Sequence, residues 1–434
     1  MVSPFRRNFK VSADDERLVR SVVGQERMPG SILPDFEALL SYVRKTSLAL
    51  TAKGQLPMKA LMEINALLTQ PVELGLRRPV QKSLPPVHGL YLLVRASGLT
   101  HAGTTGKKTS LLIDETLYDL WQQLSPIEKY GVLLETWLLR GNVEILGEER
   151  GWMGSSSDTL RKWTEFFMNV PEEGWDLTTN ARDEAYFSYE PGWHNLGLLR
   201  LFGLIEVQDA PPIIGKGWHI ERISRTPLGN ALLKVLMKQA HADFDLYMRS
   251  MKDLSVTYGV VQNWLQPYWP AWQNNLFLQK TAFREGVHIF KVSLDKNIWR
   301  RIAISANDTL INLAYAITNS VEFDHDHLHM FSYPNRLGML EQVNHPYIEE
   351  GPWTDNVKVG DVPLSIRGTM RFVFDFGDWW EFQVTLEKID TEMSLKEAAI
   401  IESHGVAPEQ YPSHDDDNDD DNDVFLVWLD DEEE

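Results

Sequence analysis

The amino-acid sequence predicts an α+β protein, with mainly helical, winged-helix-like N-terminal modules followed by a β-grasp-like sheet that one helix crosses. Two observations predict this class: apolar residues recur at helical spacing before residue 280, and they alternate along the chain after residue 287. We divide the chain into residues 1–150, 151–280, 281–395 and 396–434. The first two parts are expected to be the winged-helix-like modules, the third the α+β domain, and the fourth a trailing segment with a disordered acidic tail.

Composition excludes several classes of protein. The 434 residues include no cysteine, so disulfides, thiolate catalysis and cysteine-ligated zinc are excluded. The net charge is −20, of which residues 415–423 carry −7 and residues 430–434 carry −5, which leaves −8 elsewhere. Such a chain lacks the broad positive field that binds nucleic acid without sequence preference. Because the chain has no run of about 18 apolar residues and no signal-peptide core, we expect a cytoplasmic protein with no membrane partner.

A helix, a Gly-Leu pair, a hairpin and a second helix follow one another twice in the N-terminal region. The pairs begin at Gly98 and Gly203. This order is typical of a winged helix, whose recognition helix enters a groove of DNA. The helices in that position, residues 87–97 and 195–202, are mainly apolar, so we expect both modules to pack against protein.

Few side chains in these modules could read DNA. The polar residues of the two helices that could do so are His88, Arg95, Asn195 and Arg200. Sequence-specific readout needs several donors on one face. Lys107 and Lys108 in the first hairpin could contact phosphates, which leaves nucleic acid open as a partner.

Residues 261–279, in the second module, form a bridge rich in tryptophan and proline. Its large rings are Trp264, Tyr268, Trp269 and Trp272. They could form an aromatic platform for a ligand, or they could wedge between two halves of the chain and fix their orientation. We favour the wedge because large apolar rings usually occupy cores and interfaces.

The region after residue 287 has the pattern of a small sheet with one helix. Alternating apolar residues indicate strands, and an apolar stripe after Asp308 indicates a helix with an aspartate N-cap. The predicted elements are strands at 287–294, 298–305 and 327–334, a helix at 309–321 and a hairpin at 369–389. A three-residue hairpin turn, Gly377–Trp379, would place Phe376 opposite Trp380 and both apolar sets on one side of the sheet. It would leave Trp379 exposed.

Four segments of this domain stand out by their order and spacing. They are IWRR at 298–301, DHLHMF at 326–331, HPYIEEGPWTD at 345–355 and DFGDWWEF at 375–382. They resemble the signature blocks of the plasmid pRiA4b ORF-3-like family, over about residues 285–412. The resemblance implies a compact α+β domain associated with plasmids and mobile elements, and it brings no catalytic mechanism. Many members carry a histidine where this chain has Phe382.

The hairpin turn and its surroundings form the expected binding surface. Its members are Trp299, Arg300, Arg301, His327, Asp375, Asp378 and Trp379. Neighbouring residues of a strand point to opposite faces. One of the two arginines could therefore pair with Asp375 or Asp378, or could clamp a phosphate or carboxylate.

Three histidines at alternate positions raise the question of a metal. His325, His327 and His329 could converge with Asp375 or Asp378 on a divalent ion and a hydrolytic water. Alternate side chains of a strand lie about 7 Å apart, which is too far for three ligands of one ion without a bulge. Only His327 lies on the family motif. We expect no cofactor, and a metal site of His327, Asp375 and Asp378 stays as the alternative.

The acidic tail contains one apolar hexamer, residues 424–429. The residues expected to dock on a protein partner are Val424, Phe425, Leu426, Trp428 and Leu429. The chain has no P-loop, HExxH or GxSxG motif. We therefore expect a non-enzymatic binding or adaptor protein, associated with mobile elements or defence, that acts through protein–protein contacts. The alternatives are a metal-dependent hydrolase or nuclease and a winged-helix DNA-binding regulator.

Overall fold

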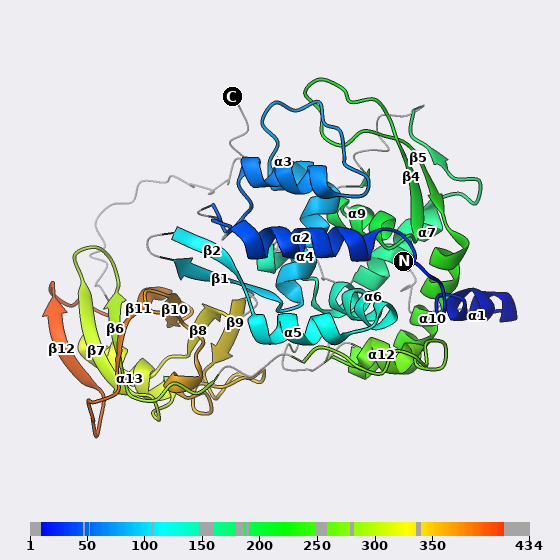
Figure 1. The fold of residues 1–434 in the computed structure, drawn as a ribbon. Coiled ribbons are helices and arrows are strands. Elements are labelled where there is room, and N and C mark those ends of the chain that lie inside the picture. Colours follow the sequence, from blue (N-terminus) through cyan, green and yellow to red (C-terminus); the bar gives the residue numbers. More distant parts are fainter. Residues whose placement is uncertain are drawn as a thin grey trace, which may run out of the picture. The chain divides into compact units, whose positions relative to one another are not determined.

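The chain folds into two compact units. The computed structural model describes residues 10–46, 48–51, 53–105, 108–146, 159–178, 186–187, 191–247, 258–277, 282–335 and 340–411. One unit comprises Met1–Arg284, Ser332–Val343 and Gly360–Met370, and the other comprises Glu285–Phe331, Asn344–Val359 and Arg371–Glu434. Helices dominate before residue 284 and antiparallel strands dominate after it (Figure 1), which confirms the α+β class.

The N-terminal region is built from helices with two small sheets. The helices are α1 (Ala13–Arg20), α2 (Ile32–Thr46), α3 (Met58–Leu67), α4 (Pro85–Ala96), α5 (Glu115–Gln123), α6 (Pro126–Glu135), α7 (Thr159–Asn169), α9 (Trp193–Leu201), α10 (Pro227–Ala242) and α12 (Val260–Leu265), with short turns η2 (Gln81–Ser83), η3 (Thr136–Arg140) and η4 (Val143–Leu146). In the part of the chain that the structure describes, none of the helices combines the length and the apolar character that crossing a bilayer requires.

The strands of this region form the two hairpins that the sequence predicts. They are β1 (Thr100–Thr105), β2 (Lys108–Ile113), β3 (Trp175–Asp176), β4 (Ile205–Asp209) and β5 (Ile220–Arg225). Strands β1 and β2 pair antiparallel, and β4 pairs with β5, which also carries β3 on its other side. The order helix, hairpin, helix therefore occurs twice, as α4–β1–β2–α5 and α9–β4–β5–α10.

The two helices in the recognition position pack against each other. Every residue of α4 is buried, and α9 lies against it. Two glycines allow this approach: a Cβ at Gly89 would lie 2.6 Å from Leu198 Cγ, and a Cβ at Gly197 would lie 2.7 Å from the carbonyl carbon of Pro85. Such distances are shorter than van der Waals contact, so the crossing requires glycine on both helices.

The polar residues of these helices serve the fold. His88, Arg95 and Asn195 are at most 4% exposed. Arg200 donates to Asp209 at 2.9 Å and lies over the Trp218 ring. The expectation that these side chains could reach DNA is wrong, because packing of α4 against α9 places them in or beside the core.

The tryptophan-rich bridge belongs to the core of the helical region. Trp264, Trp269 and Trp272 are 4%, 0% and 0% exposed and join one continuous hydrophobic cluster. Trp269 Nε1 donates to the backbone oxygen of Val19 at 2.7 Å. The interpretation of these rings as a ligand platform is wrong, because they have no exposed face to offer.

In its described residues, the C-terminal region contains a seven-stranded sheet and one long helix. Its elements are β6 (Val287–Ser293), β7 (Trp299–Ser305), α13 (Leu310–Ser320), β8 (His329–Pro334), β9 (Leu340–Asn344), η5 (Val359–Asp361), β10 (Thr369–Phe374), β11 (Trp380–Asp390) and β12 (Ala399–His404). The strand order is β12-β7-β6-β11-β10-β8-β9, and α13 lies against β7 and β12. The sequence pattern did not predict β9 or β12.

The hairpin turn is longer than the sequence suggested. Strand β10 ends at Phe374 and β11 begins at Trp380, so five residues separate them. Phe376 lies in the turn, and the prediction that it pairs with Trp380 is wrong. The cause is Asp375, which adopts a left-handed φ of 56° and ends the strand early. Trp379 is 48% exposed, as expected.

Candidate functional site

The strongest cluster of chemistry-bearing side chains lies at one end of the C-terminal sheet. Asp375 follows β10, and His327 precedes the neighbouring strand β8. The Asp375 amide donates to the Leu328 carbonyl at 3.0 Å, which ties the two loops together beyond the last ladder bonds of the strands. The antiparallel neighbours therefore bring two predicted site residues side by side.

The turn from Asp375 to Trp379 has a defined backbone. Asp375 and Trp379 both adopt left-handed conformations, with φ of 56° and 54°. The Trp379 amide donates to the Asp375 carbonyl at 2.7 Å, and the Gly377 amide donates to Asp375 Oδ1 at 2.9 Å. A left-handed residue other than glycine costs about 1–2 kcal/mol, and these bonds hold the turn in place.

His327 lies between two carboxylates. Its Nε2 is 3.5 Å from Asp375 Oδ2 and 3.6 Å from Asp326 Oδ1. The same nitrogen is 2.9 Å from the hydroxyl oxygen of Tyr411. The side chain of His327 is 37% exposed, whereas that of Asp375 is only 9% exposed. The Asp375 carboxylate is thus almost buried, whereas the His327 imidazole is partly exposed to solvent.

The segment after β12 closes one side of the cluster. Tyr411 lies 3.4 Å from Asp326 Oδ1, and Gln410 Nε2 donates to the tyrosine oxygen at 3.0 Å. Gln410 Oε1 in turn accepts from the Asp324 amide at 2.6 Å. Desolvation and the nearby Asp326 raise the pKa of Tyr411, so its hydroxyl stays protonated and able to donate.

Three exposed aromatic residues lie in the segments that form the site of Asp375 and His327. Phe376, Trp379 and Tyr411 are 38%, 48% and 51% exposed. The rings of Phe376 and Trp379 are 6.1 Å apart. The three segments that build the site, residues 322–331, 373–380 and 405–411, contain six Asp or Glu and no Lys or Arg. The surface is therefore both acidic and aromatic.

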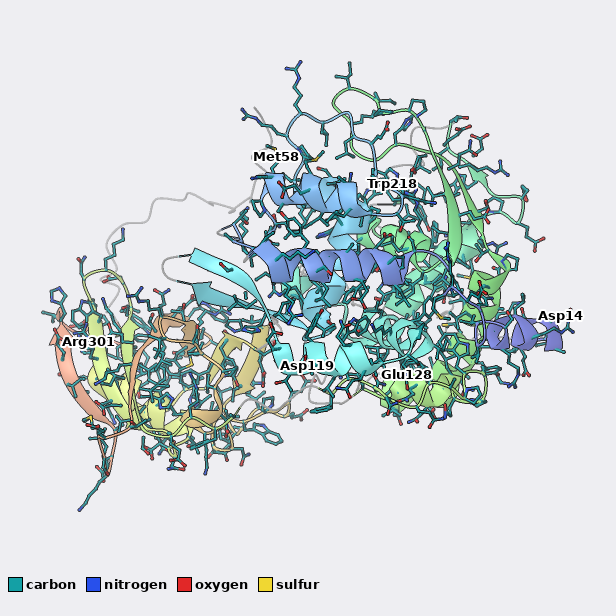
Figure 2. The ribbon with its side chains drawn as sticks, in the orientation of Figure 1. Asp14, Met58, Asp119, Glu128, Trp218 and Arg301 are labelled. Atoms are coloured by element: carbon teal, nitrogen blue, oxygen red, sulfur yellow. The ribbon has the colours of Figure 1, made fainter. Side chains whose placement is uncertain are left out.

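The structure places Trp299, Arg300 and Arg301 elsewhere. All three lie on β7, and the strands β6, β11 and β10 separate β7 from β8. Figure 2 labels Arg301 on this part of the sheet. The residues predicted as one binding surface thus form two groups, and only His327 and Asp375 come together with the turn that carries Asp378 and Trp379.

Both arginines are held by other partners. Arg300 is 5% exposed and donates to the carbonyls of Ser320 and His404, each at 2.8 Å. Arg301 Nε donates to Glu387 Oε2 at 2.6 Å, and its Nη1 pairs with Glu402. The expectation that one arginine pairs with Asp375 or Asp378 is wrong, because β11 and β12 bring acceptors closer.

The three histidines have different environments. His325 is 2.9 Å from both Thr318 Oγ1 and Asn319 Oδ1. His329 is buried, and burial lowers its pKa to about 3. They do not converge with His327, because β8 begins only at His329. Among the described residues no group of three or more His, Cys, Asp or Glu has an arrangement that could hold a metal ion.

Some predicted residues lie outside the described part of the chain. These are Lys107 and the tail residues Val424, Phe425, Leu426, Trp428 and Leu429. The backbone of Lys108 is described as the first residue of β2.

Sequence reasoning missed three members of the cluster. Asp326, Phe376 and Tyr411 were not predicted to belong to it. Asp326 adjoins His327 in the DHLHMF block, which could have indicated it. Tyr411 depends on the path of the chain after β12, and no local pattern reveals that path.

Comparison with known proteins agrees with the resemblance in the sequence. Residues 287–411 match the family described as plasmid pRiA4b ORF-3-like protein. A crystal structure of a protein of unknown function from Methanosarcina mazei Go1 aligns with 25% identity and a TM-score of 0.26, over 29% of this chain and 72% of that one. No curated protein matches the chain.

Proposed function

We propose that this chain, whose residues 287–411 form a pRiA4b ORF-3-like domain, is a non-enzymatic binding protein that takes a cationic side chain of a protein partner at the acidic and aromatic end of its sheet. The observation that carries the proposal is Asp375, a carboxylate whose side chain is only 9% exposed and faces His327, at a site whose segments also carry three exposed aromatic rings.

Electrostatics support a cationic ligand. The buried position strengthens any hydrogen bond that Asp375 accepts, because charge-assisted bonds gain as water is excluded. Asp326 and Tyr411 border the same space, and the three segments around it carry no Lys or Arg. A partner's arginine or lysine that approaches the site therefore finds acceptors, and these segments contain no Lys or Arg of their own.

The exposed aromatic rings support the same ligand class. A guanidinium or ammonium group over a tryptophan or tyrosine face gains about 0.5–2 kcal/mol. Trp379 and Tyr411 are half-exposed, and Trp379 is held in a left-handed turn by the Asp375 carbonyl. A backbone turn held in this way loses little freedom when a ligand binds, which favours recognition of a partner.

The setting of the site supports an adaptor. The sequence has no P-loop, HExxH or GxSxG motif. The family name is that of a plasmid protein. We therefore place the chain, as part of the proposal, among adaptors associated with mobile elements or defence that act through protein–protein contacts.

The test uses a ligand with a single positive side chain. N-acetyl-arginine amide would be titrated into the full-length protein, with the Trp379 indole followed by NMR. We expect saturable shifts with a Kd near the millimolar range, and a loss of affinity of about tenfold in Asp375→Asn, which corresponds to about 1.4 kcal/mol. Asparagine keeps the Gly377 acceptor and tolerates a left-handed φ, so the turn is retained.

Two matched variants serve as controls. Glu397→Gln removes one exposed negative charge outside the site, and Tyr347→Ala removes an aromatic ring that is 87% exposed elsewhere in the domain. Neither should change the affinity by more than about twofold. Equal affinity in Asp375→Asn and Glu397→Gln, or equal shifts with N-acetyl-glutamate amide, would show that the site does not select a cation.

A further inference from the structure

His327 lies between the two carboxylates of the candidate site on the sheet. Its Nε2 is 3.5 Å from Asp375 Oδ2 and 3.6 Å from Asp326 Oδ1. We propose that protonation of His327 closes this site, because the imidazolium supplies from within the chain the positive charge that a partner would otherwise bring. The inference rests on the proposed cation site and adds its regulation: the site takes a cationic side chain at neutral pH and releases it in mild acid.

Tyr411 indicates how the neutral imidazole leaves the site open. The tyrosine oxygen is 2.9 Å from His327 Nε2, and it accepts from Gln410 Nε2 at 3.0 Å. Desolvation and the nearby Asp326 raise the pKa of Tyr411, so the hydroxyl keeps its proton and can donate it. In the neutral form, Nε2 can accept this proton, since it is closer than Asp326 Oδ1 at 3.4 Å. Neutral His327 then adds no positive charge beside either carboxylate.

Protonation reverses this hydrogen bond. Both nitrogens of an imidazolium are donors, so Nε2 can no longer accept from Tyr411. The tyrosine oxygen can instead accept from Nε2 at 2.9 Å and turn its own proton to Asp326 at 3.4 Å. The closed state thus keeps the polar contacts of the group, and Asp375 gains an ion pair within the chain.

The titratable groups around His327 come from three segments. They are Asp324 and Asp326 on its own loop, Asp375 and Asp378 in the hairpin turn, and Glu409 and Tyr411 after β12. The same segments, residues 322–331, 373–380 and 405–411, contain no Lys or Arg. Arg371, farther back on β10, pairs with Glu381 at 3.5 Å. A change in the charge of His327 is therefore made in acidic surroundings.

The other two histidines of the loop have different neighbours. His325 is 2.9 Å from both Thr318 Oγ1 and Asn319 Oδ1 of α13, a helix without charged residues. Burial lowers the pKa of His329 to about 3, so His329 stays neutral in mild acid. His325 therefore offers a matched control for His327 in the same segment.

The range in which the site should close follows from ordinary titration. The side chain of His327 is 37% exposed, so protons reach it without any opening of the fold. Imidazoles ordinarily titrate at about pH 6.5 and aspartates at about pH 3.9. A guanidinium keeps its charge throughout this range. Binding of an arginine probe between pH 7.5 and pH 5.5 therefore reports on imidazoles.

The test measures binding of N-acetyl-arginine amide to the full-length protein at pH 7.5 and pH 5.5. The ionic strength is kept constant, and the Trp379 indole is followed by NMR. When only one form of a protein binds, the apparent Kd rises as the fraction of that form falls. An ordinary imidazole is about one-tenth neutral at pH 5.5, so we expect Kd to rise about five- to tenfold. In His327→Gln, Kd should differ by less than about twofold between the two pH values.

Linkage supplies a second measurement. If protonation weakens binding, binding must oppose protonation by the same factor. The ring-proton signal of His327, identified by its loss in His327→Gln, would be followed by NMR from pH 8 to pH 5. We expect the midpoint of this titration to move to lower pH when the probe is saturating. An unmoved midpoint with the probe bound would overturn the proposal.

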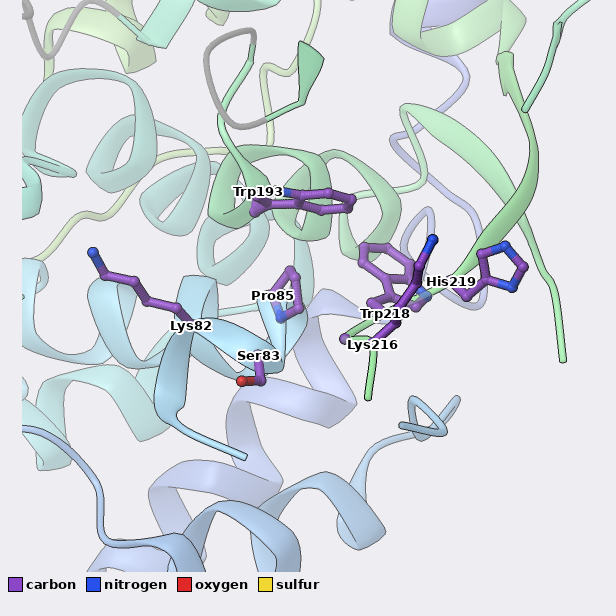
Figure 3. A pocket seen from close by; sticks show the side chains of 8 residues that line it. Lys82, Ser83, Pro85, Trp193, Lys216, Trp218 and His219 are labelled. Atoms are coloured by element: carbon purple, nitrogen blue, oxygen red, sulfur yellow. The ribbon is translucent and has the colours of Figure 1, made fainter. Parts of the chain in front are cut away.

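A cavity in the helical region supplies a further control. Its volume is about 270 Å³, and it is lined by Lys82, Ser83, Pro85, Trp193, Lys216, Gly217, Trp218 and His219 (Figure 3). Trp218 Nε1 donates to Asp209 Oδ1 at 2.8 Å. The probe could bind to these rings, and His219 could then make its binding depend on pH. Both His219→Gln and His325→Gln should retain the five- to tenfold change.

The outcomes distinguish this inference from the function on which it rests. No binding of the probe at pH 7.5 would reject the cation site, and the inference with it. Binding at pH 7.5 with an equal Kd at pH 5.5, or the same pH dependence in His327→Gln as in the wild type, would overturn the inference and leave the cation site standing. Loss of the pH dependence in His325→Gln or His219→Gln, with its retention in His327→Gln, would assign the effect to another imidazole and would also overturn the inference.

Discussion

Two tryptophan-containing segments of this protein have opposite environments. Between α10 and the C-terminal sheet, Trp264, Trp269 and Trp272 are at most 4% exposed, whereas Trp379 in the hairpin turn is 48% exposed. The sequence offered both segments as candidates for a ligand surface. The comparison teaches that the neighbours of an aromatic residue, and not its type, decide whether it stabilises the fold or meets a ligand.

The buried segment packs closely against residues of α6. The Trp272 ring lies so close to Gly131 that a Cβ there would be 2.6 Å from it. Glu128 accepts from the Asn274 amide at 2.7 Å and so fixes the chain just after the ring; Figure 2 labels Glu128 in the helical region. The exposed segment is instead held by backbone bonds within its own turn.

The largest expected effect is on the buried segment. Trp269→Ala removes a ring packed 5.9 Å from Tyr130 and the bond to the Val19 carbonyl. We expect the free energy of unfolding to fall by about 3–5 kcal/mol, measured by urea denaturation of the full-length protein. A fall below about 1 kcal/mol would mean that this segment is not part of the core.

Local sequence patterns predicted the helices and strands better than they predicted which residues pack against them. The alternation after Val287 and the stripe after Asp308 predicted β6, β7 and α13, and Ser125 with Glu128 predicted the start of α6. These features depend on contacts within a few residues. The burial of α4 and α9 depends on the packing of these two helices against each other. Because they are distant in sequence, the periodicity of either helix does not reveal this contact.

The candidate site was predicted only in part, because some of its residues come together through contacts between segments distant in sequence. His327 and Asp375 were named because they lie in recognisable motifs. Tyr411 was missed, and Arg301 was assigned to the wrong group, because β12 was not predicted. That strand supplies Glu402 to Arg301 and leads the chain back towards His327.

The second prediction separates two histidines of one motif. Burial lowers the pKa of His329 to about 3, so between pH 6.5 and pH 3 the unfolded chain binds a proton that the folded chain does not. Stability should therefore fall as the pH falls, by about 2 kcal/mol between pH 7 and pH 5. His329→Gln should remove this part of the loss, measured by urea denaturation at both values.

The matched variant is His327→Gln. His327 lies in the same motif with its side chain 37% exposed, and the loss that the burial of His329 causes should persist in this variant. If His327→Gln removed the loss and His329→Gln retained it, the assignment of the buried structural histidine would be reversed.

The third prediction concerns Arg301, which the structure places away from the candidate site. Arg301 makes a fork to Glu387, with donor–acceptor distances of 2.6 and 3.2 Å, at 31% exposure. Arg301→Lys keeps the charge and loses the fork, so we expect stability to fall by about 0.5–1 kcal/mol. The difference should shrink at high salt. The Arg301→Lys variant should bind N-acetyl-arginine amide as the wild type does, because β7 lies away from the turn.

The smallest expected effect on stability comes from replacing Trp379, the exposed counterpart of the buried Trp269. Trp379→Ala removes a half-exposed ring and should change the free energy of unfolding by no more than about 0.5 kcal/mol. Trp379→Gly should be no less stable than the alanine variant, because glycine removes the cost of a left-handed φ of 54°. Both should weaken binding of the arginine probe several-fold. A loss of stability comparable to that of Trp269→Ala would show that the turn serves the fold, and the exposed ring would then lose its role as a binding element.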